Sequence, residues 1–67
     1  MMTKKDFEAI AYEMRDELYH VESSPETDAA REVRLYEWRR MVSIMADVCA
    51  ASNGRFNRGR FVYACER

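Results

Sequence analysis

The 67-residue chain contains only one proline and two glycines. This scarcity leaves few obligatory breaks in secondary structure, and the many Glu, Arg, Ala and Met residues favour helix. The chain also lacks the run of about 20 apolar residues that a transmembrane helix needs. Its first residues lead into an amphipathic segment rather than the apolar segment of a signal peptide. We therefore expect a cytoplasmic protein that does not enter a membrane.

Cysteine and histidine are equally scarce, at two cysteines and one histidine. A structural zinc site takes four ligands, so Cys49, Cys65 and His20 are too few for a metal site within one chain. Small secreted scaffolds rely on four or more cysteines, so a disulfide framework is not expected. The two cysteines either pair with each other or serve as small buried hydrophobic residues. We expect the second arrangement, with free thiols.

No pattern typical of an enzyme is present. His20 is followed within four residues by a glutamate and two serines. A Ser–His–acid triad is defined by its geometry, however, and helix capping explains the serines more simply. Gly54 and Gly59 match neither of the glycine-rich phosphate-binding motifs. The sequence thus predicts a protein without catalytic residues or cofactor.

A first helix is predicted at about residues 3–21. Thr3 is a good N-cap, and Asp6, three residues later, forms a variant of the capping box. Apolar residues then recur at spacings of four and three, as in a helix that packs along an antiparallel neighbour. These residues are Phe7, Ala11, Met14, Leu18 and Val21. Tyr12 and Tyr19 fall on the opposite face, where they indicate either a second contact surface or ordinary partial exposure.

A second, longer helix is predicted at about residues 25–52. Ser24 as N-cap with Pro25 at the first helical position predicts its start, and Asn53-Gly54 predicts a left-handed stop. The helix has two apolar stripes. One comprises Leu35, Trp38, Val42, Met45 and Cys49; the other comprises Val33, Ile44, Val48 and Ala51, with Met41 between the two. The shorter first helix can cover only one stripe.

A third helix is predicted at about residues 58–65. Asn57 is its N-cap, and Phe56 and Phe61 occupy the positions of a hydrophobic staple. We expect this helix to cover the second stripe of the long helix through Phe61, Val62 and Cys65. Residues 1–67 then form a single small all-α domain, an antiparallel helical hairpin with a short C-terminal helix packed back on it.

Both ends of the chain carry a distinctive pattern. The start reads Thr3-Lys4-Lys5-Asp6-Phe7, followed by Ile10-Ala11, and the end reads Asn53-Gly54-Arg55-Phe56-Asn57-Arg58-Gly59-Arg60-Phe61-Val62-Tyr63-Ala64-Cys65. These ends resemble a group of small, mostly uncharacterised phage and prophage proteins that close with N-P-R-F-D-x-x-R-F-x-x-A-C. Gly54 replaces the proline of that pattern and Asn57 the aspartate, and both replacements keep turn or cap chemistry. The resemblance implies a phage-type accessory protein and no catalytic residues.

The net charge of −1 conceals an asymmetry along the chain. Residues 1–28 hold three basic and eight acidic side chains, a sum of −5, whereas residues 29–67 hold eight basic and four acidic, a sum of +4. This asymmetry has two interpretations. Either the acidic first helix lies beside the basic remainder within the fold, or the basic part forms a face that binds an anionic partner.

Nucleic-acid binding is the alternative function. Arg55, Arg58 and Arg60 alternate with aromatic residues, as in proteins that bind single strands. However, the pI of about 5.8 lies well below the value above 9 that is typical of nucleic-acid modules. The staple also accounts for both phenylalanines of this segment.

Protein binding is the function that we expect. A domain of this size is marginally stable alone, which favours self-association. The part of the long helix around Trp38 is predicted to be left uncovered by both neighbours. The expected interface residues are Tyr12, Tyr19, Val33, Leu35, Trp38, Arg39, Met41, Val42 and Met45. We predict a homodimeric, non-enzymatic phage-type accessory protein that binds and modulates or inhibits a host protein, such as a defence or regulatory factor.

Overall fold

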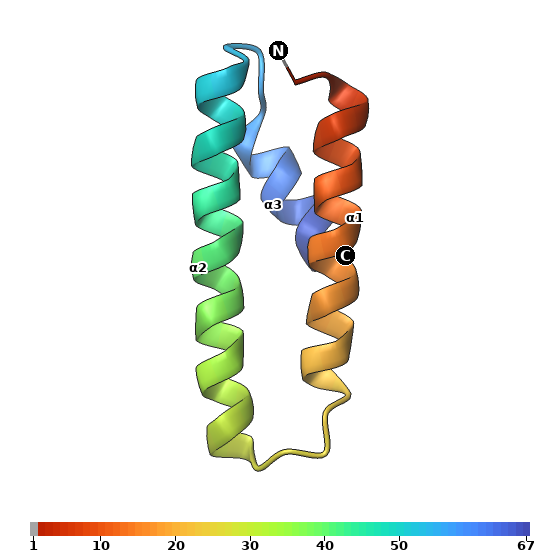
Figure 1. Ribbon diagram of the computed structural model, residues 1–67, viewed down its shortest axis with the longest axis vertical. Coiled ribbons are helices and arrows are strands. Elements are labelled where there is room, and N and C mark those ends of the chain that lie inside the picture. The colour runs from red at the N-terminus through yellow and green to blue at the C-terminus, as the bar shows by residue number, and fades with distance from the viewer. Residues whose placement is uncertain (1) are drawn as a thin grey trace.

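The computed structural model describes residues 2–67, which contain three helices and no strand. These are α1 (Lys4–Glu22), α2 (Asp28–Ser52) and α3 (Arg58–Glu66). α1 and α2 run antiparallel, and α3 folds back along one face of this hairpin so that the C-terminus lies beside α1 (Figure 1). The predicted all-α fold, a helical hairpin with a short C-terminal helix packed on it, is confirmed.

The start of α1 follows the predicted local chemistry. The Thr3 backbone N–H donates to Asp6 Oδ2 (2.8 Å), and the Asp6 N–H donates to Thr3 Oγ1 (3.4 Å), which completes the capping box. The predicted apolar seam faces inward. Ala11 and Val21 are buried, and Phe7, Met14 and Leu18 are half-buried, packed against the core.

α2 begins three residues later than predicted. Its N-cap is Thr27, whose hydroxyl accepts a hydrogen bond from the Ala30 N–H at 3.2 Å. Ser24 and Pro25 belong to the connection between the helices, so the prediction that they start the helix is wrong. Arg31, in the first turn of α2, favours this later start, because its Nη2 donates a hydrogen bond to the Ser24 carbonyl oxygen at 2.7 Å.

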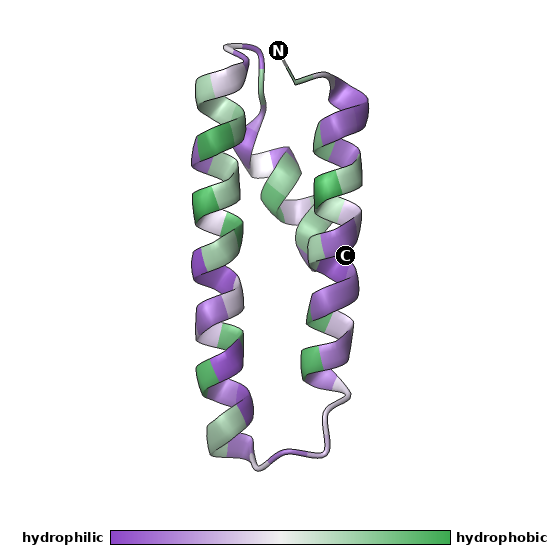
Figure 2. Cartoon of the chain, in the orientation of Figure 1, coloured by the Kyte–Doolittle hydropathy of each residue, from purple (hydrophilic) through white to green (hydrophobic). Residues whose placement is uncertain are grey.

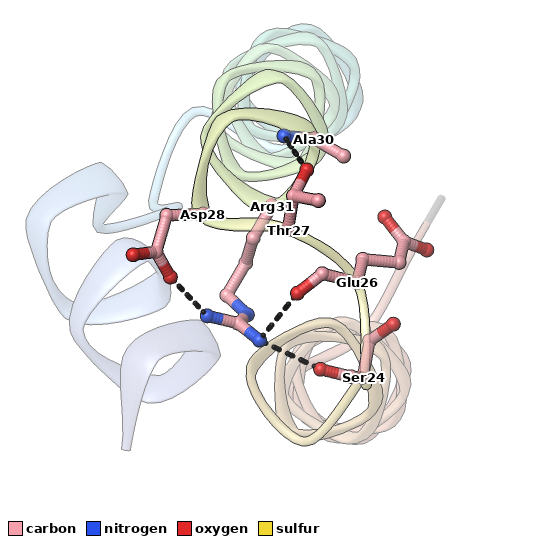
Figure 3. Close-up of polar contacts among 6 residues, drawn as sticks. All are labelled: Ser24, Glu26, Thr27, Asp28, Ala30 and Arg31. Atoms are coloured by element: carbon pink, nitrogen blue, oxygen red, sulfur yellow. Dashed lines mark hydrogen bonds and ion pairs between the residues drawn. The ribbon is translucent and has the colours of Figure 1, made fainter.

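Arg31 holds this connection in shape (Figure 3). Besides its bond to Ser24, Nη2 donates to the Glu26 carbonyl oxygen (3.1 Å), and Nη1 donates to Asp28 Oδ1 (3.0 Å). One half-buried guanidinium thus binds two backbone carbonyls of the connection and an acidic side chain in the first turn of α2. Arginine suits this role because its planar fork presents several donors at once.

The end of α2 also differs from the prediction. No residue in the described range 2–67 has a positive φ, so the predicted left-handed stop at Asn53-Gly54 is wrong. Asn53 instead makes the turn with its own side chain and carbonyl. Its Oδ1 accepts from the Arg55 N–H (2.9 Å), and its carbonyl oxygen accepts from the Phe56 N–H (3.0 Å).

The start of α3 is as predicted. Asn57 caps it by accepting a hydrogen bond from the Arg60 N–H (3.0 Å). The rings of Phe56 and Phe61 lie 5.4 Å apart between centroids, which confirms the hydrophobic staple. A second aromatic contact joins Phe56 to Phe7 of α1 at 4.7 Å. The turn before α3 is therefore packed against α1.

α3 does not cover the second stripe of α2, contrary to the prediction. Phe61 and Cys65 enter a core shared by all three helices, together with Ala11, Trp38, Val42, Ala46 and Cys49. Three members of this core, Ala46, Cys49 and Cys65, have no exposed surface. Their small side chains let α3 approach both other helices closely. In this position α3 buries apolar surface on α1 and α2 at the same time.

Candidate interaction surfaces

Trp38 is part of the core rather than of an open surface. Its side chain is 5% exposed, and its Nε1–H donates to the Met14 carbonyl oxygen of α1 at 2.7 Å. Val42 is 4% exposed, while Leu35 and Met45 are half-buried. The prediction that α2 is left uncovered around Trp38 is therefore wrong, because α1 reaches this level and supplies an acceptor for the indole.

The exposed apolar residues of α2 form what we call the α2 stripe. It comprises Val33, Met41, Ile44, Val48 and Ala51, and its three central members Met41, Ile44 and Val48 are each about half exposed. Hydrophobic residues extend over much of the C-terminal half of α2 (Figure 2). Val33 and Met41 were among the predicted interface residues. Ile44 and Val48 are not among them, because the sequence predicts that the third helix covers the second stripe. Arg39 is exposed on another side of α2.

Tyr12 and Tyr19 are 58% and 66% exposed and border what we call the tyrosine groove. This cavity of about 360 Å³ lies between α1 and the end of α3. It is lined by Tyr12, Arg15, Asp16, Leu18, Tyr19, Glu22, Glu66 and Arg67. Arg15 connects its two sides, because its Nη1 donates to the Arg67 carbonyl oxygen at 2.7 Å. The guanidinium carbon of Arg15 also lies 5.4 Å from the centre of the Tyr12 ring, within cation–π distance.

Helical periodicity places Arg15 between Tyr12 and Tyr19, but sequence reasoning missed its contact with Arg67. The two arginines are 52 positions apart, and only the return of α3 along α1 brings them together. A further arginine–tyrosine contact lies at the same end of α3, where the Arg67 guanidinium carbon is 5.4 Å from the centre of the Tyr63 ring. The tyrosines of α1 thus belong to a larger cluster of tyrosine and arginine.

The three arginines of the predicted nucleic-acid site do not lie on one surface. Arg58 turns toward α2, where it binds Asp47 Oδ1 (2.6 Å) and Ser43 Oγ (2.9 Å). Arg55 and Arg60 instead line a cleft of about 470 Å³, which we call the basic cleft. Its other lining residues are Lys4, Phe7, Glu8, Ala11, Asn53, Phe56, Asn57, Phe61 and Ala64.

Cys49 and Cys65 are free and fully buried, as predicted. Burial raises the pKa of both thiols, and that of Cys65 rises to about 11 with smaller contributions from Glu66 and Cys49.

His20 is exposed, and its Nε2 lies 3.6 Å from Asp16 Oδ2. Within residues 2–67 it makes no hydrogen bond to the nearby serines, and no three metal-binding side chains lie together. No helix in this range is long and apolar enough to cross a membrane.

Comparison of the chain with protein-family models, with curated proteins and with solved structures gave no match. Its function must therefore be inferred from the tyrosine groove, the α2 stripe and the basic cleft.

Proposed function

We propose that this protein is a non-enzymatic, phage-type accessory protein that binds a host protein and modulates or inhibits it in the host cytoplasm. The observation that supports this proposal is the tyrosine groove. Tyrosine and arginine are enriched among the residues that contribute most to protein–protein binding. Here Tyr12, Tyr19 and Arg15 border one groove together with the C-terminal Arg67.

The groove is suited to binding by being partly preorganised. The hydrogen bond of Arg15 to the Arg67 carbonyl joins α3 to α1, and Arg15 also lies against the Tyr12 ring. A surface whose side chains are already held loses less conformational entropy when a partner docks. Both acidic and basic side chains line the groove, so a partner segment with apolar groups and both charges would fit it best.

The tyrosine groove can be tested by affinity capture from host lysate. We expect the Tyr12→Ser/Tyr19→Ser variant to capture about tenfold less of the partner, because truncating one interface hot spot commonly costs more than 1 kcal/mol. Both residues are exposed, so helicity measured by circular dichroism should be unchanged. Tyr36→Ser is the matched control, since Tyr36 is 62% exposed on α2. Equal capture by the double variant and the control would contradict the assignment of this site.

Nucleic-acid binding is a second candidate because of the basic cleft. Lys4, Arg55 and Arg60 surround the half-buried rings of Phe7 and Phe56, and none of the three cations makes an ion pair within residues 2–67. An aromatic floor with a cationic rim is the arrangement on which single-stranded bases stack.

This candidate predicts that a fluorescent single-stranded oligonucleotide binds with an affinity that falls steeply with salt. Arg55→Gln/Arg60→Gln should weaken binding about tenfold, because each lost phosphate contact removes electrostatic attraction. Arg39→Gln/Arg40→Gln, with the same charge change at two exposed sites of α2, should have a much smaller effect. The absence of binding to DNA and RNA at low salt would eliminate this candidate.

A homodimer also remains part of our proposal. Its interface differs from the predicted one, because Trp38 and Val42 are buried in the core of each chain.

A further inference from the structure

The α2 stripe is an apolar surface that the described residues 2–67 leave uncovered. Met41, Ile44 and Val48 are 49%, 48% and 50% exposed, and they recur at the spacing of one helix face. Trp38, Val42 and Cys49, by contrast, face α1 and α3 and are buried. The stripe therefore lies on the side of α2 away from the core, and an apolar helix face of this kind commonly marks an interaction site.

Two opposite charges flank the stripe on one of its sides. At about 100° per residue, Arg40 and Asp47 fall within about 60° of Ile44 in one direction, and Met41 and Val48 within about 60° in the other. Arg40 is exposed and makes no ion pair within residues 2–67. Asp47 binds Arg58, but its side chain is 71% exposed, so its carboxylate can accept a second cation.

We propose that a second copy of this chain covers the stripe, with the two α2 helices antiparallel about a two-fold axis near Ile44. In this arrangement Ile44 meets Ile44 of the second copy, and Met41 lies beside its Val48. The two-fold axis also brings Arg40 beside Asp47 of the second copy, and it does so twice. Each Asp47 then lies between the Arg58 of its own chain and the Arg40 of the other.

The charge pattern favours a second copy of the chain as the partner and an antiparallel direction of the two α2 helices. Rotation about a two-fold axis across antiparallel helices places like sides of the stripe together, so the apolar side meets the apolar side and Arg40 meets Asp47. A parallel pair would place the charged side of one stripe against Met41 and Val48 of the other. A stripe that is complementary to its own reversed copy favours a second copy over an unrelated protein.

This dimer gives the proposed homodimer its interface and its helix direction, and it does not depend on the proposed binding of a host protein. The contact involves α2, whereas the tyrosine groove lies on α1 and the end of α3, so each copy keeps its groove accessible. The dimer is tested on purified protein and the groove on lysate, so either proposal can fail without the other.

Sedimentation of the purified full chain tests the interface. We expect the mass to rise from 8.0 kDa toward twice that value as the concentration increases. Ile44→Glu should raise the dissociation constant at least about tenfold, because it places an unpaired charge at the centre of the contact. Ala50→Glu is the control, since Ala50 is exposed on another side of α2. Arg40→Glu should also weaken the dimer, whereas Arg39→Glu should not.

Cross-linking tests the direction of the helices. The native cysteines are fully buried, so introduced cysteines are the sites that a short bismaleimide reaches first. Mixed Met41→Cys and Val48→Cys chains should cross-link to each other more than either does to itself. A chain that stays at the monomer mass at high concentration, or one whose dimer survives Ile44→Glu, overturns the proposal. Preferential cross-linking of Met41→Cys to itself overturns the antiparallel arrangement.

Discussion

The Trp38→Ala variant is expected to be largely unfolded at room temperature. Removing a buried tryptophan from a core costs about 3–5 kcal/mol. The substitution also removes the hydrogen bond from Nε1 to the Met14 carbonyl oxygen. A small domain of this kind derives only about 3–5 kcal/mol from its core, so little stability should remain. Far-ultraviolet circular dichroism and urea titration would measure the loss of helix.

Two substitutions serve as controls for this result. Tyr36→Ala, two residues earlier on an exposed face, should change the free energy of unfolding by no more than about 0.5 kcal/mol. Trp38→Phe keeps an aromatic ring but lacks the N–H donor, so it should fall between the two. If Trp38→Ala were as stable as Tyr36→Ala, Trp38 could not lie in the core.

Raising the pH above 9 is expected to destabilise the protein through Cys65. Burial, with smaller contributions from Glu66 and Cys49, raises the pKa of the Cys65 thiol from 9.0 to about 11. The folded protein therefore holds this proton more tightly than the unfolded chain does. The resulting stability is complete below pH 9 and is lost as the pH rises from 9 through about 11. Because solvent lies close to the core of so small a protein, we expect a loss of roughly 2 kcal/mol or less.

Urea titrations at a series of alkaline pH values would measure this loss. The pKa of Cys49 is raised in the same direction, so the control is the double variant Cys49→Ala/Cys65→Ala. This variant should be less stable at neutral pH because it loses two buried sulfur atoms. Its free energy of unfolding should nevertheless fall less between pH 9 and 11 than that of the unmodified chain. Identical falls in the two proteins would exclude the thiols as the cause.

The helix ends illustrate how far local sequence predicts structure. Thr3 with Asp6, and Asn57 with its flanking phenylalanines, form the predicted caps because each interaction spans only a few residues. The start of α2 was missed because Ser24 and Thr27 are both good caps. The bonds from Arg31 to the connection favour Thr27, and the pairing of Glu26 with Arg34 adds to them.

The candidate sites were predictable only in part. Helical periodicity predicted that Tyr12 and Tyr19 share an outer face, and both are exposed. The contact of Arg15 with Arg67 was not predictable, because it depends on the path of α3 along α1. The same holds for Arg58, which is adjacent in sequence to the basic cleft but binds Asp47 of α2.

The sequence by itself determined that this protein is a three-helix domain and that its long helix has two apolar stripes. Both results follow from local propensity and from the period of the helix. Only the tertiary structure decided which stripe is covered. α3 packs on one face of the hairpin against both α1 and α2, because Phe61 and Cys65 can there be buried against two helices, beside the small residues Ala11, Ala46 and Cys49. Trp38 is buried as a result, and Met41, Ile44 and Val48 remain exposed.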